Sequence, residues 1–148
     1  MSGRTRGYAH RIDIAAGVAP VWLALTQTES LCLWCSPQAQ INAREGGILR
    51  ASVDRVIELE AHIDVLLPQR RMRLIYLPSE ELPASGSAIV DDFILDGSDP
   101  SKTIVRLLGS GFPASPEWDT LYLRLRTGWE RAVARLKVLV EQNVKESA

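Results

Sequence analysis

The segment SPEWDTLYLRLRTGWERAVARLKVLVEQNV, residues 115–144, decides the fold class that this sequence predicts. Its apolar residues recur every three or four positions with charged residues between them, which is typical of an amphipathic helix. Ser115 can cap this helix, and Pro116 suits its first turn. The segment is long enough for about seven to eight turns. Its apolar stripe consists of Trp118, Leu121, Tyr122, Leu125, Trp129, Ala132, Val133, Leu136, Leu139 and Val140.

Most of the chain between residues 38 and 110 alternates with a period of two, which predicts strands. Residues 48–67 predict a long antiparallel strand with one apolar side and one solvent-facing side. The solvent-facing side carries Glu58, Glu60, His62 and Asp64. Further strands are predicted over residues 70–77, 88–95 and 102–109.

Upstream of this region, residues 8–14 predict a first strand, and residues 16–27 and 28–37 predict two short helices. Helices at the two ends of a run of strands indicate an α+β fold. We expect residues 1–148 to form a single domain, with a curved antiparallel sheet of about six to seven strands around the long C-terminal helix. A gap between such a sheet and helix is a natural ligand cavity.

Composition narrows the class of protein. The formal net charge of −1 gives no overall basic field, so we expect no nucleic-acid partner. No apolar run approaches the ~20 residues of a membrane span. The first residues lack the apolar stretch of a secretory signal, so the expected location is cytoplasmic.

Six segments carry a resemblance to a known superfamily. The chain resembles the helix-grip (START-like, SRPBCC) superfamily of lipid-transfer, polyketide-cyclase and birch-pollen-allergen-like proteins. Within it, the chain is similar to the branch named after the activator of the heat-shock chaperone ATPase. The resemblance implies a helix-grip fold, but its members include binders, cyclases and chaperone partners. The segments are APVWLALT (19–26), ESLCLWCSP (29–37), REGG (44–47), LLPQRRMRLIY (66–76), LLGSGF (107–112) and GWERAVARLKVLVE (128–141).

The two cysteines, Cys32 and Cys35, have the C-x-x-C spacing of redox and metal motifs. A redox pair usually opens a helix after a buried strand, whereas Cys32 falls inside a short predicted helix. A structural zinc site needs four ligands, and the sequence has no second such pair. We therefore interpret both residues as half-buried apolar thiols and expect neither a metal nor a cofactor.

Apolar and aromatic residues on the predicted inner faces are the candidate ligand contacts. A cavity between the sheet and helix 115–144, of ~300–1,000 Å³, would select a ligand by shape and by burial. The candidate lining residues are Leu59, Ile63, Met72, Leu74, Tyr76, Phe93, Trp118, Tyr122 and Leu125.

Asp91 is a further candidate, and its orientation stays open. If Ile89 and Phe93 face the helix, Asp91 faces it too, and a buried carboxylate needs a partner or a raised pKa. If Val90 and Ile94 face the helix, Asp91 lies in water. An inward Asp91 can orient a ligand hydroxyl or act as an acid–base group.

The remaining polar residues have simpler interpretations. His62 alternates with acidic residues, which places it on the solvent face of the sheet, and His10 is expected to be a hydrogen-bonded edge residue. The arginines at 70, 71 and 73 are expected to pair with acidic residues on an adjacent strand.

The leading functional hypothesis is non-enzymatic binding of a small hydrophobic or amphipathic molecule. The alternatives are a cyclase- or hydrolase-like enzyme, with Asp91 or Tyr76 carrying a proton, and a protein partner of a chaperone ATPase. No catalytic residue is assigned, since the sequence shows no nucleophile–base pair, phosphate loop or metal cluster. A homodimer through an exposed sheet edge also stays open.

Overall fold

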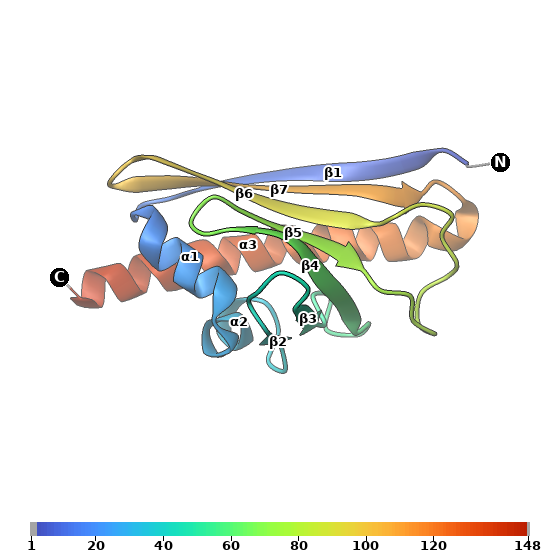
Figure 1. The fold of residues 1–148 in the computed structure, drawn as a ribbon, viewed down its shortest axis with the longest axis horizontal. Coiled ribbons are helices and arrows are strands. Elements are labelled where there is room, and N and C mark those ends of the chain that lie inside the picture. Colours follow the sequence, from blue (N-terminus) through green and yellow to red (C-terminus); the bar gives the residue numbers. More distant parts are fainter. Residues whose placement is uncertain (1–2, 148) are drawn as a thin grey trace.

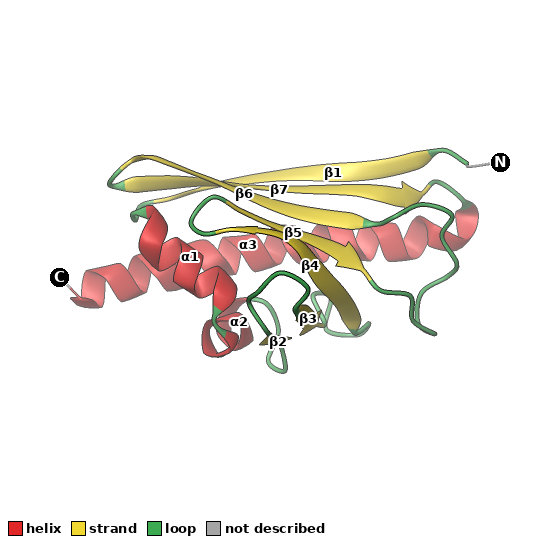
Figure 2. Cartoon of the chain, in the orientation of Figure 1, coloured by secondary structure: helices red, strands yellow, loops and turns green. Residues whose placement is uncertain are grey.

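The computed structural model describes residues 3–147, which form seven strands, a 3₁₀ turn and three α-helices (Figure 2). In chain order these are β1 (Thr5–Ile14), α1 (Val18–Thr26), α2 (Thr28–Trp34), β2 (Gln40–Ile41), β3 (Ile48–Ala51), β4 (Leu59–Leu67), β5 (Arg71–Tyr76), β6 (Val90–Asp99), β7 (Lys102–Pro113), η1 (Pro116–Trp118) and α3 (Asp119–Ser147).

The strands form one curved antiparallel sheet in the order β1-β7-β6-β5-β4-β3-β2. The first strand therefore pairs with the last, and β1 and β2 are the two edges. Helix α3 runs along the sheet behind the strands, and α1 and α2 lie together near one end (Figure 1). This is the helix-grip α+β fold that the sequence predicts, and its two short helices follow the first strand as expected.

The inner face of the sheet and the apolar stripe of α3 form one core. Nine residues of α3 are buried, and they match the stripe with three exceptions. Gly128 belongs only to the observed set, Leu139 is only partly buried, and Trp118, although buried, lies in η1. The helix begins at Asp119 rather than at Ser115, because residues 116–118 form a 3₁₀ turn and the Ser115 side chain makes no capping hydrogen bond. None of the described helices is both apolar enough and long enough to cross a bilayer.

The prediction of one long strand over residues 48–67 is wrong. Strand β3 ends at Ala51, and residues 52–58 form a loop before β4 begins at Leu59. Arg55 has a φ of 67°, a left-handed conformation that a strand does not allow. The Asp54 carboxylate accepts hydrogen bonds from the backbone N–H groups of Val56 and Ile57, which fixes a turn there.

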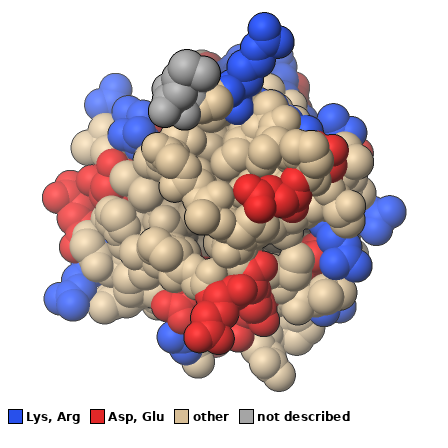
Figure 3. Space-filling view, turned by 90° about the vertical axis from the view of Figure 1, so that its right-hand side faces the viewer, with Lys and Arg blue, Asp and Glu red and all other residues tan. Residues whose placement is uncertain are grey.

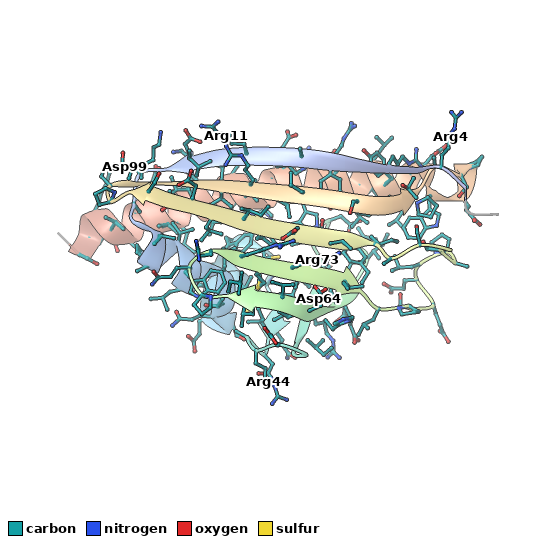
Figure 4. The ribbon with its side chains drawn as sticks, turned by 45° about the horizontal axis from the view of Figure 1, so that its top comes forward. Arg4, Arg11, Arg44, Asp64, Arg73 and Asp99 are labelled. Atoms are coloured by element: carbon teal, nitrogen blue, oxygen red, sulfur yellow. The ribbon has the colours of Figure 1, made fainter. Side chains whose placement is uncertain are left out.

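The charged outer face of the sheet shows part of the predicted cross-strand pairing. Arg73 on β5 contacts Asp64 on β4, with 3.4 Å between their charged atoms (Figure 4). Arg71 instead pairs with Asp92 on β6 at 2.7 Å. Both pairs are partly exposed, so each contributes little to stability.

Candidate ligand-binding site

Asp91 faces α3, and two tyrosines hold it. Its side chain is fully buried, with an exposed fraction of 0%. The Tyr8 hydroxyl donates to Asp91 Oδ1, and the Tyr76 hydroxyl donates to Oδ2 at 2.5 Å. The indole N–H of Trp129 points at the Tyr76 hydroxyl from α3, at 3.5 Å. We call Tyr8, Asp91 and Tyr76 the Tyr–Asp–Tyr cluster; both carboxylate oxygens in it have a donor.

The cluster depends on a glycine between its members. Tyr8 on β1 and Asp91 on β6 both lie opposite Gly109 of the intervening strand β7. A Cβ atom on Gly109 would lie 2.4 Å from the Tyr8 ring. Because Gly109 has no side chain, the Tyr8 ring crosses over β7 and reaches a carboxylate two strands away.

The protonation of the cluster follows from its burial. Burial raises the pKa of Asp91 to about 6, although the hydrogen bonds from Tyr76 and Tyr8 act in the opposite direction. Burial, and then the charge of Asp91, raise the pKa of both tyrosines. At neutral pH the cluster is therefore a carboxylate that accepts hydrogen bonds from two neutral phenols. A modest fall in pH protonates it.

A pocket of about 420 Å³ opens beside this cluster, at the end of the molecule where α3 begins. The segment 77–89, which joins β5 to β6, forms most of its wall together with Tyr76 and Trp118. The Trp118 indole N–H donates to the Ala84 carbonyl at 3.2 Å, which ties the segment to the start of α3. We call this the loop pocket.

The loop pocket suits an uncharged or weakly polar molecule. Of the described residues that line it, none carries a formal charge, and serine hydroxyls supply its polar side chains along with Tyr76. Figure 3 looks onto this end of the molecule. Side chains without charge cover most of the middle of that face, and the acidic side chains form separate groups at its left, right of its centre and at its bottom. A ligand here would be held chiefly by burial of apolar surface.

Two of the ten predicted contact residues, Tyr76 and Trp118, line the loop pocket. The other eight are buried in the core between the sheet and α3. Aromatic rings fill much of the space there, so the described pocket lies at the end of the helix rather than along it. The eight residues are Leu59, Ile63, Met72, Leu74, Asp91, Phe93, Tyr122 and Leu125.

Phe112 is the centre of this aromatic packing and was missed by the sequence analysis. Its ring centroid lies 5.3 Å from that of Tyr8, 5.6 Å from that of Tyr122 and 6.4 Å from that of Trp118. Tyr122 is anchored further by its hydroxyl, which donates to the Gly7 carbonyl at 2.5 Å. The alternation of β7 buries its odd-numbered residues up to Gly109 and would have placed Phe112 outward, but the alternation changes at Gly111, which has a φ of 83°. The pairing of β1 with β7, which brings Tyr8 into the group, had no signal in the sequence.

The cysteines behave as apolar side chains. Cys35 is buried, and burial raises the pKa of its thiol to about 12, which keeps it protonated and unreactive at neutral pH. Cys32 is half-buried, and its thiol donates to the Ala39 carbonyl at 3.3 Å. Within residues 3–147, no three histidine, cysteine or acidic side chains gather as a metal site would require.

The two histidines lie outside the loop pocket. His62 on β4 is half-buried among the polar residues of the sheet's outer side. His10 on β1 hydrogen-bonds through Nε2 to the Arg126 carbonyl at 3.0 Å, and burial lowers its pKa. Neither contacts the Tyr–Asp–Tyr cluster by a hydrogen bond.

Comparison with solved structures gives the same fold at low sequence identity. Protein MLL2253 from Mesorhizobium loti is 22% identical, with a TM-score of 0.77 over 93% of this chain and 98% of its own. The Aha1 dimer from Colwellia psychrerythraea is 20% identical, with a TM-score of 0.77 over 92% and 96%. A point mutant of norcoclaurine synthase from Thalictrum is 14% identical, with a TM-score of 0.71 over 97% and 98%.

A comparison with curated protein sequences finds no match. The model of one protein family matches residues 15–141, which include α1, α2, six of the strands in whole or in part, and most of α3. That family is described as "Activator of Hsp90 ATPase homolog 1-like protein". With its fold and the greater part of its sequence both in agreement, the chain belongs to the Activator of Hsp90 ATPase homolog 1-like family.

Proposed function

We propose that this protein binds a small, largely apolar molecule in the loop pocket and does no chemistry on it. The observation that carries the proposal is an uncharged pocket of about 420 Å³ whose wall includes Tyr76 and Trp118. This volume falls in the range of small-molecule sites. Serine hydroxyls on segment 77–89 would fix the orientation of a polar group on the ligand.

Thermal unfolding with a panel of lipids, polyketides and aromatic compounds tests this function. A ligand that binds only the folded state stabilises it by ~2.7 kcal/mol at a hundredfold excess over its dissociation constant. We expect at least one compound class to raise the melting temperature. A broad panel without any shift would contradict the proposal.

Two tryptophan substitutions locate the binding site. Ala84→Trp places a large side chain at the wall of the loop pocket, where Ala84 itself is exposed. Ala43→Trp makes the same change at an exposed position between β2 and β3. We expect Ala84→Trp to abolish the ligand-induced shift and Ala43→Trp to preserve it. Equal shifts in both variants would place the ligand elsewhere.

A second candidate function is acid–base catalysis on a hydrophobic substrate. It is favoured by Tyr76, which lines the loop pocket and also hydrogen-bonds to a carboxylate whose pKa is raised to about 6. The norcoclaurine synthase neighbour, an enzyme solved with a transition-state analogue, supports such use of this fold. If Tyr76→Phe and Asp91→Asn both left turnover of a bound compound unchanged, neither residue would be a proton carrier.

Three further expectations stay predictions: a homodimer, a chaperone partner and a cytoplasmic location. The Colwellia neighbour is described as a dimer, which supports the first. Light scattering after size-exclusion chromatography measures it directly. A pull-down with the purified chaperone tests the second.

A further inference from the structure

A second concave site lies on the other side of the α3 backbone from the aromatic core, where the helix meets the loop that follows β3. This groove has a volume of about 480 Å³ and shares no lining residue with the loop pocket. Helix α3 contributes Arg124, Arg131 and Arg135, which are spaced by seven and four residues and so share one helix face. The loop contributes Asp54 and Arg55. We call it the arginine groove.

The backbone brings these charges together at one close contact. A Cβ atom on Gly128 would lie 2.9 Å from the Val53 carbonyl oxygen, so only glycine lets the loop lie this close to the helix. Two residues further along the loop, Arg55 takes its left-handed conformation. The glycine in α3, which weakens a helix interior by ~1 kcal/mol relative to alanine, is thereby explained by packing.

The protein neutralises only part of the positive charge in the groove. The Arg135 guanidinium donates to the carbonyls of Trp34 and Cys35, at 2.8 and 3.4 Å, and these acceptors are uncharged. Burial lowers the pKa of Arg135, and the charges of Arg55 and Arg131 lower it further. Within residues 3–147, the only acidic side chain that lines the groove is Asp54. Four guanidinium groups therefore face one carboxylate.

The Asp54 carboxylate has a hydrogen-bond donor on only one of its two oxygens. The Asp54 side chain has an exposed fraction of 7%. Its Oδ1 accepts two backbone hydrogen bonds, but its Oδ2 is buried and has no hydrogen-bond partner among the described residues. The nearest charged atom, Arg124 Nε, is 3.9 Å away, which is too far for a hydrogen bond. A buried acceptor without a donor is costly, so Asp54 Oδ2 is available to a donor from outside the chain.

An oxyanion with an adjacent hydroxyl group would supply an acceptor for the groove arginines and a donor for Asp54 Oδ2. Guanidinium groups bind phosphate oxygens in pairs of parallel hydrogen bonds, and several of them can surround one phosphate. If the exposed Arg124 side chain, whose Nε lies 3.9 Å from Asp54 Oδ2, turned toward the phosphate, a hydroxyl group beside the phosphate would donate to this oxygen. We propose that the arginine groove binds a phosphate monoester with a hydroxyl group on the neighbouring carbon, either free or as a lipid headgroup.

Calorimetric titration with glycerol 3-phosphate tests the proposal, with methyl phosphate and glycerol as partial ligands. We expect saturable binding of glycerol 3-phosphate, binding of methyl phosphate that is weaker by about fivefold, and no binding of glycerol. Absence of saturable binding for glycerol 3-phosphate, together with no binding in the vesicle experiment below, would overturn the proposal.

Single charge removals separate a specific site from general attraction. Arg131→Gln removes an exposed groove arginine and should weaken binding of glycerol 3-phosphate by about tenfold. Arg44→Gln removes another exposed arginine, in the loop between β2 and β3, and should leave the affinity unchanged. Equal weakening by the two variants would overturn the proposal.

Asp54→Asn tests the role of the free carboxylate oxygen. The amide oxygen can keep the two backbone hydrogen bonds, while the amide nitrogen replaces the acceptor that the hydroxyl group would use. The variant should bind methyl phosphate and glycerol 3-phosphate with equal affinity. A preference for glycerol 3-phosphate that persists in Asp54→Asn would show that Asp54 does not read the hydroxyl group.

Vesicles distinguish the two sources of the ligand. Co-flotation with phosphatidylcholine vesicles that contain phosphatidylinositol 4-phosphate, but not with phosphatidylcholine alone, would assign the site to a lipid headgroup. Binding of free glycerol 3-phosphate without co-flotation would assign it to a free phosphate ester. In either case Arg131→Gln should reduce the signal, and Ala84→Trp should not, since the loop pocket is separate.

Discussion

Asp91 and Asp54 both have buried carboxylates, but the fold supplies hydrogen-bond donors to both oxygens of only one of them, Asp91. Each oxygen of Asp91 accepts a hydrogen bond from a tyrosine, and no charged side chain takes part. Asp54 has one oxygen bonded to the backbone and one without a donor, in a groove lined by arginines. The comparison contrasts a buried charge that is satisfied within the chain and serves the fold with one that keeps an unpaired oxygen, where we propose that a ligand binds.

The largest effect should come from deleting the satisfied carboxylate. Asp91→Ala leaves the Tyr8 and Tyr76 hydroxyls buried without an acceptor, at about 1–3 kcal/mol each, and opens a small cavity. We expect a loss of about 4 kcal/mol in the free energy of unfolding, measured by urea denaturation.

Asp96→Ala on the same strand is the matched control. Asp96 is exposed, and its removal should change the free energy of unfolding by less than about 1 kcal/mol. If the two variants lost equal stability, the hydrogen bonds of the Tyr–Asp–Tyr cluster would not contribute specifically to the free energy of unfolding.

The charge of Asp91 should make stability depend on pH. Its pKa is about 6 in the folded protein against 3.8 for the free side chain, so the folded state binds more protons between these values. The free energy of unfolding contributed by this group therefore falls as the pH rises from 4 to 7.

A comparison with Asp91→Asn, which cannot ionise, isolates this contribution. The stability of the wild type relative to the variant should decrease by about 2–3 kcal/mol across this window, as measured by denaturation at each pH. A difference independent of pH would mean that the pKa of Asp91 is not raised.

Gly109→Ala tests the Tyr–Asp–Tyr cluster without changing its carboxylate, because the substitution changes the position of the Tyr8 ring. The added methyl group would lie 2.4 Å from the Tyr8 ring and must displace it from Asp91. We expect a loss of about 2–3 kcal/mol in denaturation experiments. Adding Tyr8→Phe to Gly109→Ala should cost little more, since the hydrogen bond is already broken, and full additivity would contradict this account.

The smallest effect is expected at the incomplete carboxylate. Asp54→Ala removes the acceptor for the backbone N–H groups of Val56 and Ile57 but also relieves the unpartnered oxygen. The net loss should be about 1 kcal/mol, measured in the same way. A loss as large as that of Asp91→Ala would show that Asp54 is as important for the fold as Asp91.

The sequence was sufficient for the fold class because repeating apolar patterns along the chain decide it. The stripe of α3 and the alternation of the strands are local signals, and they predicted the α+β architecture and the position of the short helices. The same alternation could not orient Asp91, because Ile89 and Phe93 on one face and Val90 and Ile94 on the other are equally apolar. Of its two tyrosines, Tyr76 comes from the neighbouring strand β5, but Tyr8 comes from β1, 83 residues away in the sequence.

The positions of the loop pocket and the arginine groove were less predictable, because they depend on how side chains from distant elements pack together. Nothing in the spacing of Phe112, Tyr122 and Trp118 shows that their rings meet and leave space only near segment 77–89. The loop at 52–58 was hidden by its apolar residues Val53, Val56 and Ile57, which suggest a continuous strand. Asp54, a residue that often stabilises turns, was the available signal against that interpretation.

The length of α3 has a practical consequence for measuring binding. Its 29 residues span roughly 44 Å, from the loop pocket to the opposite end of the molecule (Figure 1). The start of β1 lies at the pocket end, because Thr5 pairs with Pro113 just before η1. An affinity tag or fluorophore placed after Ser147 would therefore leave the pocket unobstructed, whereas one fused before β1 would lie beside its mouth.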